Sequence, residues 1–167
     1  MHQELTTLEI QDNPFKLISK DWTLITTKCG GKVNTMTASW GGVGTLWHKD
    51  VAFIFIRPQR LTFEYLENSD TFSLNFMTED YRKQLSLCGS KSGRDVDKIA
   101  ECGFTVGTSE DTPYLEQSRL ALVCRKMYFS DLDPKHFLDP SIDKNYAAKD
   151  YHRMYVGEIL KVLSADE

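Results

Sequence analysis

Cysteine and histidine are scarce in this chain, with four of each among 167 residues. No CxxC pair and no HxxxH or HExxH pattern occurs among them, so the usual zinc-binding spacings are absent. In a chain without a secretory signal, free buried thiols are the expected state of the cysteines. We therefore predict no metal site.

Long apolar runs are also missing. The longest, Val51 to Ile56, has six residues, far fewer than the roughly 20 that span a bilayer. The net charge of −4 and the pI near 5.6 weigh against a nucleic-acid coat or a polybasic membrane-binding surface. The first residues, MHQELTTLEI, lack a charged segment followed by an apolar one. These absences predict a cytoplasmic protein that binds neither nucleic acid nor membrane.

The composition is that of an ordinary globular protein. Hydrophobic residues make up 41% and charged residues 26% of the chain, which argues against disorder. No internal repeat and no long Pro/Gly/Ser linker divides it, and the length suffices to bury a core. We expect a single domain over residues 1–167.

Short strands dominate the pattern. Strands are expected at Trp22–Thr27, Asn34–Trp40, Val51–Ile56, Phe72–Phe76, Arg119–Phe129 and Met154–Leu163. Val51–Ile56 is apolar on both faces and should be central, whereas Phe72–Phe76 alternates and should be half-buried. Glycines at 30 and 31 predict a hairpin turn, and those at 41, 42 and 44 predict an interruption of the strand after Trp40.

Three short helices are expected between these strands. Thr62 should cap one that runs to about Glu67, and Thr78 should cap another that stops at a left-handed Gly89. The third should start near Asp95, turn Val96, Ile99 and Ala100 inward, and stop at Gly103. Because the helices do not alternate with the strands as in βαβ units, the pattern predicts a mainly β, α+β fold: an antiparallel barrel with a few peripheral helices.

A polar segment broken by prolines separates the last two strands. It runs from Ser130 to Lys149 and is too long for a hairpin connection. It is either a surface excursion or a loop that contacts a partner.

A candidate anion site follows the buried strand. Arg57 and Arg60 flank Pro58, and Thr62 begins the next helix, so guanidinium and hydroxyl groups gather where a phosphate would fit. The alternative is a pair of solvated arginines beside an ordinary helix cap.

The segment NTMTASW offers small and hydroxyl side chains to a flat aromatic ligand. Thr35, Thr37 and Ser39 supply hydroxyls, and Trp40 and Trp47 would form walls. The alternative is a Thr-rich edge strand followed by a flexible glycine turn.

Two further features are ambiguous on their own. Gly89 to Gly93, GSKSG, lacks the spacing of a Walker loop, but it is either an anion-binding nest or a plain helix connection. His152, with an ordinary pKa near 6.5, is either a functional group or a structural one. No nucleophile–base triad is visible.

Together, five segments in order resemble the flavin reductase-like family of FMN-binding split β-barrels, in particular its flavoredoxin-like branch. They span roughly residues 20 to 160 and read NTMTASWGGVGTLWHK, FIFIRPQRLTFEYL, FSLNF, LCGSKSGRDVDKIAECGFT and DYHRMYVGEI. The resemblance implies an antiparallel split β-barrel and non-covalent FMN. The cofactor-binding residues it implies are Asn34, Thr35, Met36, Thr37, Ala38, Ser39, Trp40, Arg57, Pro58, Arg60, Thr62, Gly89, Ser90, Lys91, Ser92 and Asp95.

The resemblance also implies a function. NAD(P)H would reduce the flavin, His152 would act at its reactive face, and an unknown small molecule or protein would accept the electrons. Without a GxGxxG fingerprint, the nicotinamide cofactor would bind only transiently. A homodimer with FMN near its interface is expected. The alternatives are an FMN-binding electron carrier without nicotinamide activity, and a barrel that has lost its flavin.

Overall fold

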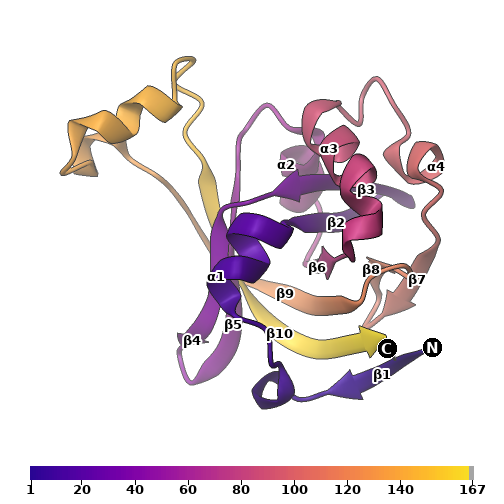
Figure 1. Cartoon of the computed structure of the whole chain (residues 1–167). Helices are drawn as coiled ribbons and strands as arrows, with labels where there is room; N and C mark the ends of the chain where they lie inside the picture. Colours follow the sequence, from indigo (N-terminus) through magenta and orange to yellow (C-terminus); the bar gives the residue numbers. More distant parts are fainter. Residues whose placement is uncertain (166–167) are drawn as a thin grey trace.

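The computed structural model describes residues 1–165, which form a curved antiparallel sheet with short helices around it (Figure 1). The strands of the sheet run in the order β3-β2-β6-β9-β10-β5-β4, and β1 pairs with the far end of β10. Their bounds are β1 (His2–Leu5), β2 (Thr23–Cys29), β3 (Lys32–Ala38), β4 (Gly41–Leu46), β5 (Lys49–Ile56), β6 (Thr71–Phe76), β9 (Leu120–Asp131) and β10 (Arg153–Ala165). A separate hairpin consists of β7 (Val106–Ser109) and β8 (Thr112–Leu115).

The helices lie mainly over β2 and β3. They are α1 (Pro14–Lys16), which continues as a π-helical turn over Leu17–Asp21, then α2 (Leu61–Glu67), α3 (Arg82–Ser90) and α4 (Lys98–Cys102). The helix α2 packs on β2 and β3, and both α3 and α4 pack on β3. None of the helices in residues 1–165 is long and apolar enough to cross a bilayer.

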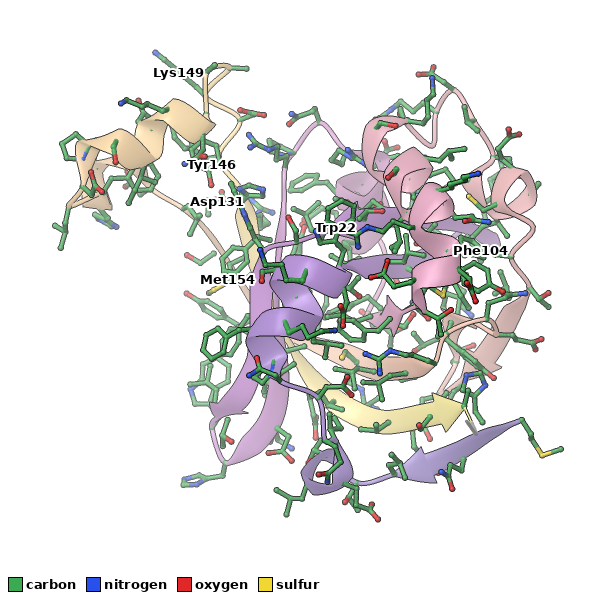
Figure 2. The ribbon with its side chains drawn as sticks, in the orientation of Figure 1. Trp22, Phe104, Asp131, Tyr146, Lys149 and Met154 are labelled. Carbon is green, nitrogen blue, oxygen red and sulfur yellow. The ribbon has the colours of Figure 1, made fainter. Side chains whose placement is uncertain are left out.

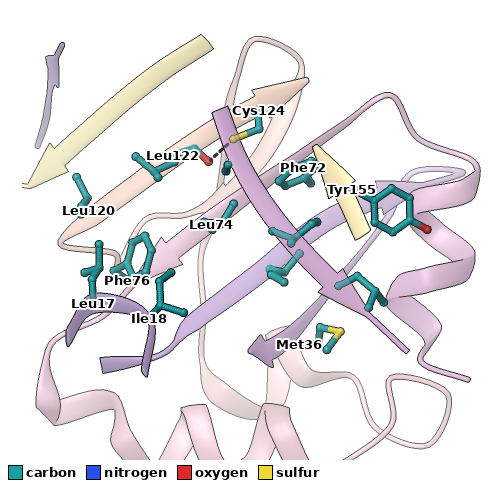
Figure 3. Close-up of a cluster of buried hydrophobic side chains, with 14 of the residues drawn as sticks. Leu17, Ile18, Met36, Phe72, Leu74, Phe76, Leu120, Leu122, Cys124 and Tyr155 are labelled. Atoms are coloured by element: carbon teal, nitrogen blue, oxygen red, sulfur yellow. Dashed lines mark hydrogen bonds between the residues drawn. The ribbon is translucent and has the colours of Figure 1, made fainter. Parts of the chain in front are cut away.

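The long strand β10 holds the sheet together. It pairs with β9 along most of its length, with β5 through residues 153–158, and with β1 through residues 162–165. The main core is one cluster that includes Phe72, Leu74 and Phe76 of β6 and Tyr155 of β10 (Figure 3). A second cluster under α3 includes Leu24, Leu85, Phe104 and Leu115.

The strand β6 is covered on both faces, so its expected half-burial is wrong. Ser73 and Asn75 are fully buried because the chain around β8 satisfies their polar groups. The Ser73 hydroxyl donates to the Pro113 carbonyl at 2.7 Å, and the Asn75 Oδ1 accepts from the Leu115 N–H at 2.8 Å. In β6 the alternating residues therefore belong to a strand whose polar side chains are hydrogen-bonded inside the protein.

The strand that contains Asn34 ends at Ala38, so the predicted interruption next to the glycines is confirmed. Gly41, Gly42 and Gly44 belong to β4, which pairs with β5. The hairpin turn at residues 30 and 31 is confirmed between β2 and β3. The strand β1 and the β7–β8 hairpin were not expected, because both are only four residues long.

Two of the expected helix signals are wrong. The N-cap of α2 is Arg60, and Thr62 lies buried inside the helix. Gly89 is also helical, and α3 ends on extended backbone at Lys91. The stop at Gly103 is confirmed by its left-handed φ of +68°.

The helix that Gly103 ends begins later than expected. Asp97 caps α4, its Oδ1 accepting from the Ala100 N–H at 3.2 Å. Ala100 is exposed, whereas Lys98 is buried. The inward face of α4 therefore contains a lysine where an apolar residue was expected.

Residues 132–150, here called the arm, leave the end of β9 and return at β10. Figure 1 shows them projecting from the sheet in orange and yellow. Two 3₁₀ turns, Pro134–His136 and Pro140–Asn145, give the arm its shape. The expected excursion is confirmed, although β9 continues to Asp131 before it begins.

Candidate functional site

A pocket of about 220 Å³ opens beyond the end of β3. Residues distant in sequence meet there: β3 and the residues after it, the end of β5, the turn that follows β5, and the residue before β10. The predicted site residues that line it are Met36, Thr37, Ala38, Ser39, Trp40, Arg57, Arg60 and His152, and Phe55 joins them. The fold therefore brings half of the predicted site together.

Aromatic rings form the walls of this pocket. The rings of Trp40 and His152 lie with centroids 5.4 Å apart, and Phe55 meets His152 edge-on at 6.5 Å. Trp40 is 50% exposed, so the pocket is open on its side. Flat apolar walls around one open face suit a planar ring system.

Arg60 supplies an uncompensated positive charge. Its guanidinium donates to the carbonyl oxygens of Gly89 at 3.0 Å and Cys88 at 3.2 Å, near the end of α3. Burial lowers the pKa of Arg60, but a guanidinium stays protonated at neutral pH. No carboxylate within residues 1–165 forms an ion pair with it. This charge is free to attract an anion.

Lys98 is a second cation beside Arg60, and it is buried; the sequence analysis missed it. Its side chain is 2% exposed, and its Nζ donates to the Thr35 carbonyl at 3.0 Å and the Cys88 carbonyl at 2.9 Å. Burial and, to a lesser extent, the positive charge of Arg60 lower the pKa of Lys98 to about 8. Its one sequence signal is its place in the segment LCGSKSGRDVDKIAECGFT.

Arg57 does not join Arg60 in an anion site in the way that the sequence predicted. Its guanidinium donates to Asp150 Oδ2 at 2.9 Å and to the Asn145 carbonyl at 3.0 Å, and lies 4.9 Å from the Tyr146 ring centroid. All three partners belong to the arm. Arg57 therefore lines the pocket while it anchors the arm, and Asp150 balances its charge.

His152 is held in a neutral state. Its Nδ1 lies 2.7 Å from the Tyr146 hydroxyl, and both side chains are buried. Burial, reinforced by the positive charge of Arg57 and partly opposed by Asp150, lowers the pKa of His152 to about 4. The expectation of an ordinary pKa near 6.5 is wrong for this environment, because an imidazolium would be buried beside a cation.

Several predicted site residues use their polar groups inside the protein. The Thr62 hydroxyl accepts from Asn34 Nδ2 at 2.9 Å, and the hydroxyls of Thr35 and Thr26 lie 2.9 Å apart within the sheet. Asn34 and Asp95 line a different cavity, of about 640 Å³, together with Lys98. The polar groups of Asn34, Thr35 and Thr62 are therefore paired within the protein.

The segment Gly89–Gly93, which was predicted to border the ligand, lies only partly beside the pocket. Gly89 and Ser90 line a second pocket of about 380 Å³ that shares Thr37 and Ser39 with the first. A Cβ on Gly89 would lie 3.4 Å from the Cβ of Thr37, so α3 approaches β3 closely there. Among the described residues, Pro58, Lys91 and Ser92 line neither pocket.

Comparisons with known proteins give the fold a family context. The family model described as "Flavin reductase like domain" matches residues 15–167. An FMN-binding domain of a flavin reductases-like enzyme from Shewanella baltica is 17% identical, with a TM-score of 0.72 over 98% of this chain and 77% of its own. A flavoredoxin from Methanosarcina acetivorans is 24% identical, with a TM-score of 0.70 over 97% and 77%.

A third solved structure is similar to the same degree. It is an FMN-binding protein from Thermus thermophilus with bound 1-cyclohex-2-enone, 20% identical, with a TM-score of 0.67 over 96% of this chain and 76% of its own. No curated protein matches the chain. These likenesses confirm the expected mainly antiparallel split-barrel fold.

Proposed function

The chain belongs to the flavin reductase-like domain family, and on that premise we propose that it works as a single FMN-binding domain. In this proposal it passes electrons from NAD(P)H through the flavin to an acceptor. One observation carries the proposal: Met36–Trp40, Arg60 and His152, far apart in sequence, line a single pocket.

The residues present fit FMN. Trp40 and Phe55 offer flat apolar walls to the isoalloxazine ring, and Thr37 to Ser39 present small side chains at the end of a strand. Arg60, without a carboxylate partner within residues 1–165, matches the charge of the ribityl phosphate. Lys98 adds a second positive charge behind β3.

When bound, FMN supplies the hydride and electron transfer, and the protein supplies binding and orientation. Trp40 and Phe55 exclude water from one side of the ring system. Arg60 binds the phosphate through a guanidinium that does not titrate. His152, neutral above about pH 4, offers one ring nitrogen to the pocket while Nδ1 contacts Tyr146.

A second candidate function is electron transfer without nicotinamide activity. Similarity to a flavoredoxin, at 24% identity, favours it. The two candidates share the flavin and differ in whether NAD(P)H reduces it. A third reading, a barrel that has lost its flavin, predicts a colourless protein.

The deciding experiment is an absorbance spectrum of the protein supplied with FMN and freed of excess flavin. Anaerobic addition of NADH or NADPH follows. A retained flavin band that bleaches on addition supports the reductase. A retained band that does not bleach supports the electron carrier, and no retained band rejects both.

The phosphate assignment predicts different losses for two flavins. Arg60→Ala should weaken FMN binding by about ten- to a hundredfold, because a charge-assisted hydrogen bond is worth roughly 1.5–3 kcal/mol. Riboflavin, which has no phosphate, should bind the variant and the wild type nearly equally. Fluorescence titration measures both.

Arg125→Ala is the matched control, since Arg125 is exposed on β9 and its loss changes the net charge equally. It should leave both flavins bound as in the wild type. Equal losses of FMN and riboflavin in Arg60→Ala would reject the phosphate assignment.

We further propose that the chain forms a homodimer. An exposed aromatic patch lies where the turn between β4 and β5 meets the end of β9, with Trp47 52% and Tyr128 47% exposed. The rings of Trp47 and Tyr128 meet edge-on with centroids 5.8 Å apart. Clustered exposed aromatic side chains are typical of protein–protein interfaces.

A further inference from the structure

Only one side chain of the arm is buried against the rest of the protein. Tyr146 is 5% exposed, and every other side chain in residues 132–150 is exposed or half-buried. Figure 2 shows Tyr146 on the side of the arm that faces the sheet. A segment of this length that buries a single tyrosine is organised around the contacts of that tyrosine.

Those contacts fix the tyrosine ring from several sides. The Arg57 guanidinium lies over it, and Tyr151 packs against it with centroids 4.9 Å apart. The backbone on both sides is also held, because Arg57 donates to the Asn145 carbonyl and both Arg57 and Gln59 donate to Asp150. The hydroxyl of Tyr146 is thereby held against His152.

The direction of the hydrogen bond follows from the protons available. Within residues 1–165 the Tyr146 hydroxyl has one hydrogen-bond partner, His152 Nδ1 at 2.7 Å. If Nδ1–H donated, the buried phenolic proton would have no acceptor, and burying an unpaired donor is unfavourable. If the phenol donates, its proton is used and Nδ1 acts as the acceptor.

We propose that Tyr146 is a positioning residue that holds His152 in the tautomer with its proton on Nε2. The imidazole then presents an N–H donor to the pocket. The inference rests on the proposed flavin site, and it assigns the arm a role there: through Tyr146 the arm sets what His152 offers to a bound ring.

A neutral N–H donor selects a particular kind of partner atom. It pairs with an acceptor such as a carbonyl oxygen, which flavins and nicotinamides both carry, or an unprotonated ring nitrogen, which flavins carry. It does not pair with an N–H group. The tautomer therefore decides which edge of a ring system can face His152.

Nuclear magnetic resonance of the full chain labelled with ¹⁵N-histidine tests the tautomer directly, with or without flavin. Long-range ¹H–¹⁵N correlations distinguish the two neutral tautomers, and loss of one signal set in His152→Gln assigns His152. The expected pattern has a protonated Nε2 and a bare Nδ1. A protonated Nδ1 in the wild type would overturn the proposal.

Tyr146→Phe keeps the ring and its packing and removes only the hydroxyl. A mixture of His152 tautomers is expected, and a wild-type pattern in this variant would also overturn the proposal. Tyr151→Phe is the matched control, because it removes a tyrosine hydroxyl next to the arm that donates to Asp143 Oδ1 at 2.7 Å, away from the pocket. It should leave the His152 signals unchanged.

Kinetics extend the test to the flavin-loaded protein. Tyr146→Phe should slow flavin reduction by about two- to tenfold, the range that one neutral hydrogen bond supplies. FMN should stay bound, since Arg60 is untouched. A wild type that binds no FMN would reject the proposed function while the histidine spectra still decide the tautomer.

Discussion

Lys98 places a positive charge inside the protein, and within residues 1–165 no carboxylate pairs with it. Two main-chain carbonyls accept its hydrogen bonds, and Arg60 repels it. The folded state therefore disfavours the protonated amine. A site that binds an anion can tolerate two neighbouring positive charges, because a bound phosphate would offset their repulsion.

The stability of the flavin-free protein should rise with pH through the titration of Lys98. Its pKa is lowered from 10.5 to about 8, so between those values the unfolded state binds more protons than the folded state. The free energy of unfolding then increases with pH, by on the order of 3 kcal/mol once both pKa values are passed. Urea denaturation from pH 7 to 10 measures the rise.

Lys98→Met isolates this effect from other titrations. Burial raises the pKa of the Cys88 thiol to about 12, which acts in the opposite direction at high pH and is retained in the variant. The free energy of unfolding of the wild type should increase relative to that of the variant as pH rises. A pH-independent difference would show that Lys98 keeps an ordinary pKa.

Site residues were predictable where the signal was local. Met36 to Trp40, Arg60 and His152 lie in segments that resemble a known family, and the fold brings them together. The role of Arg57 was not predictable, because its partners Asn145 and Asp150 lie about ninety residues away in the arm. The neutral state of His152 was not predictable either, since the residues around it include Arg57, which is distant in sequence, and Tyr146 of the arm.

At the scale of elements, the pairing of β10 with β9 depends on close contact at Gly157. A Cβ there would lie 2.5 Å from Phe72 Cζ and 3.0 Å from Cys124 Cβ. The register between β9 and β10 shifts at this position. The backbone at Gly157 lies so close to Phe72 and Cys124 that no side chain larger than hydrogen fits there without a shift of these neighbours.

Gly157→Ala should therefore destabilise the protein by about 1–3 kcal/mol, the usual effect of overpacking a core. Urea denaturation gives the change in the free energy of unfolding. Gly42→Ala on β4 is the control, because its Cβ would meet no atom within 4 Å. Equal stability of the two variants would mean that the Phe72 ring moves aside without loss.

Elements were predictable from sequence when their own residues set the pattern. The apolar run Val51–Ile56 and the turn at residues 30 and 31 were found in this way. The burial of Ser73 and Asn75 was not, because it depends on β8, forty residues further along the chain. The periodicity of a sequence shows which side chains are polar. It does not show which distant groups will form hydrogen bonds with them.

At the scale of the whole molecule, the exposed aromatic patch predicts self-association. Light scattering of the flavin-loaded protein at micromolar concentration should give about twice the chain mass. Trp47→Glu should convert the dimer to a monomer, because a carboxylate buried in an apolar interface is strongly unfavourable. Leu138→Glu, at a side chain 98% exposed on the arm, should leave the dimer intact. A monomeric wild type would reject this interface.

The strand β10 also has a consequence for how the chain acquires its fold during synthesis. It is the last strand within residues 1–165, and its partners include β1, where His2 pairs with Ala165. A nascent chain therefore exposes the apolar face of β5, β6 and β9 until β10 has left the ribosome. Proteins dominated by such distant pairings fold slowly, over about milliseconds to seconds. Yield in cells should respond more strongly to chaperone supply and translation rate than the thermodynamic stability of the finished barrel would suggest.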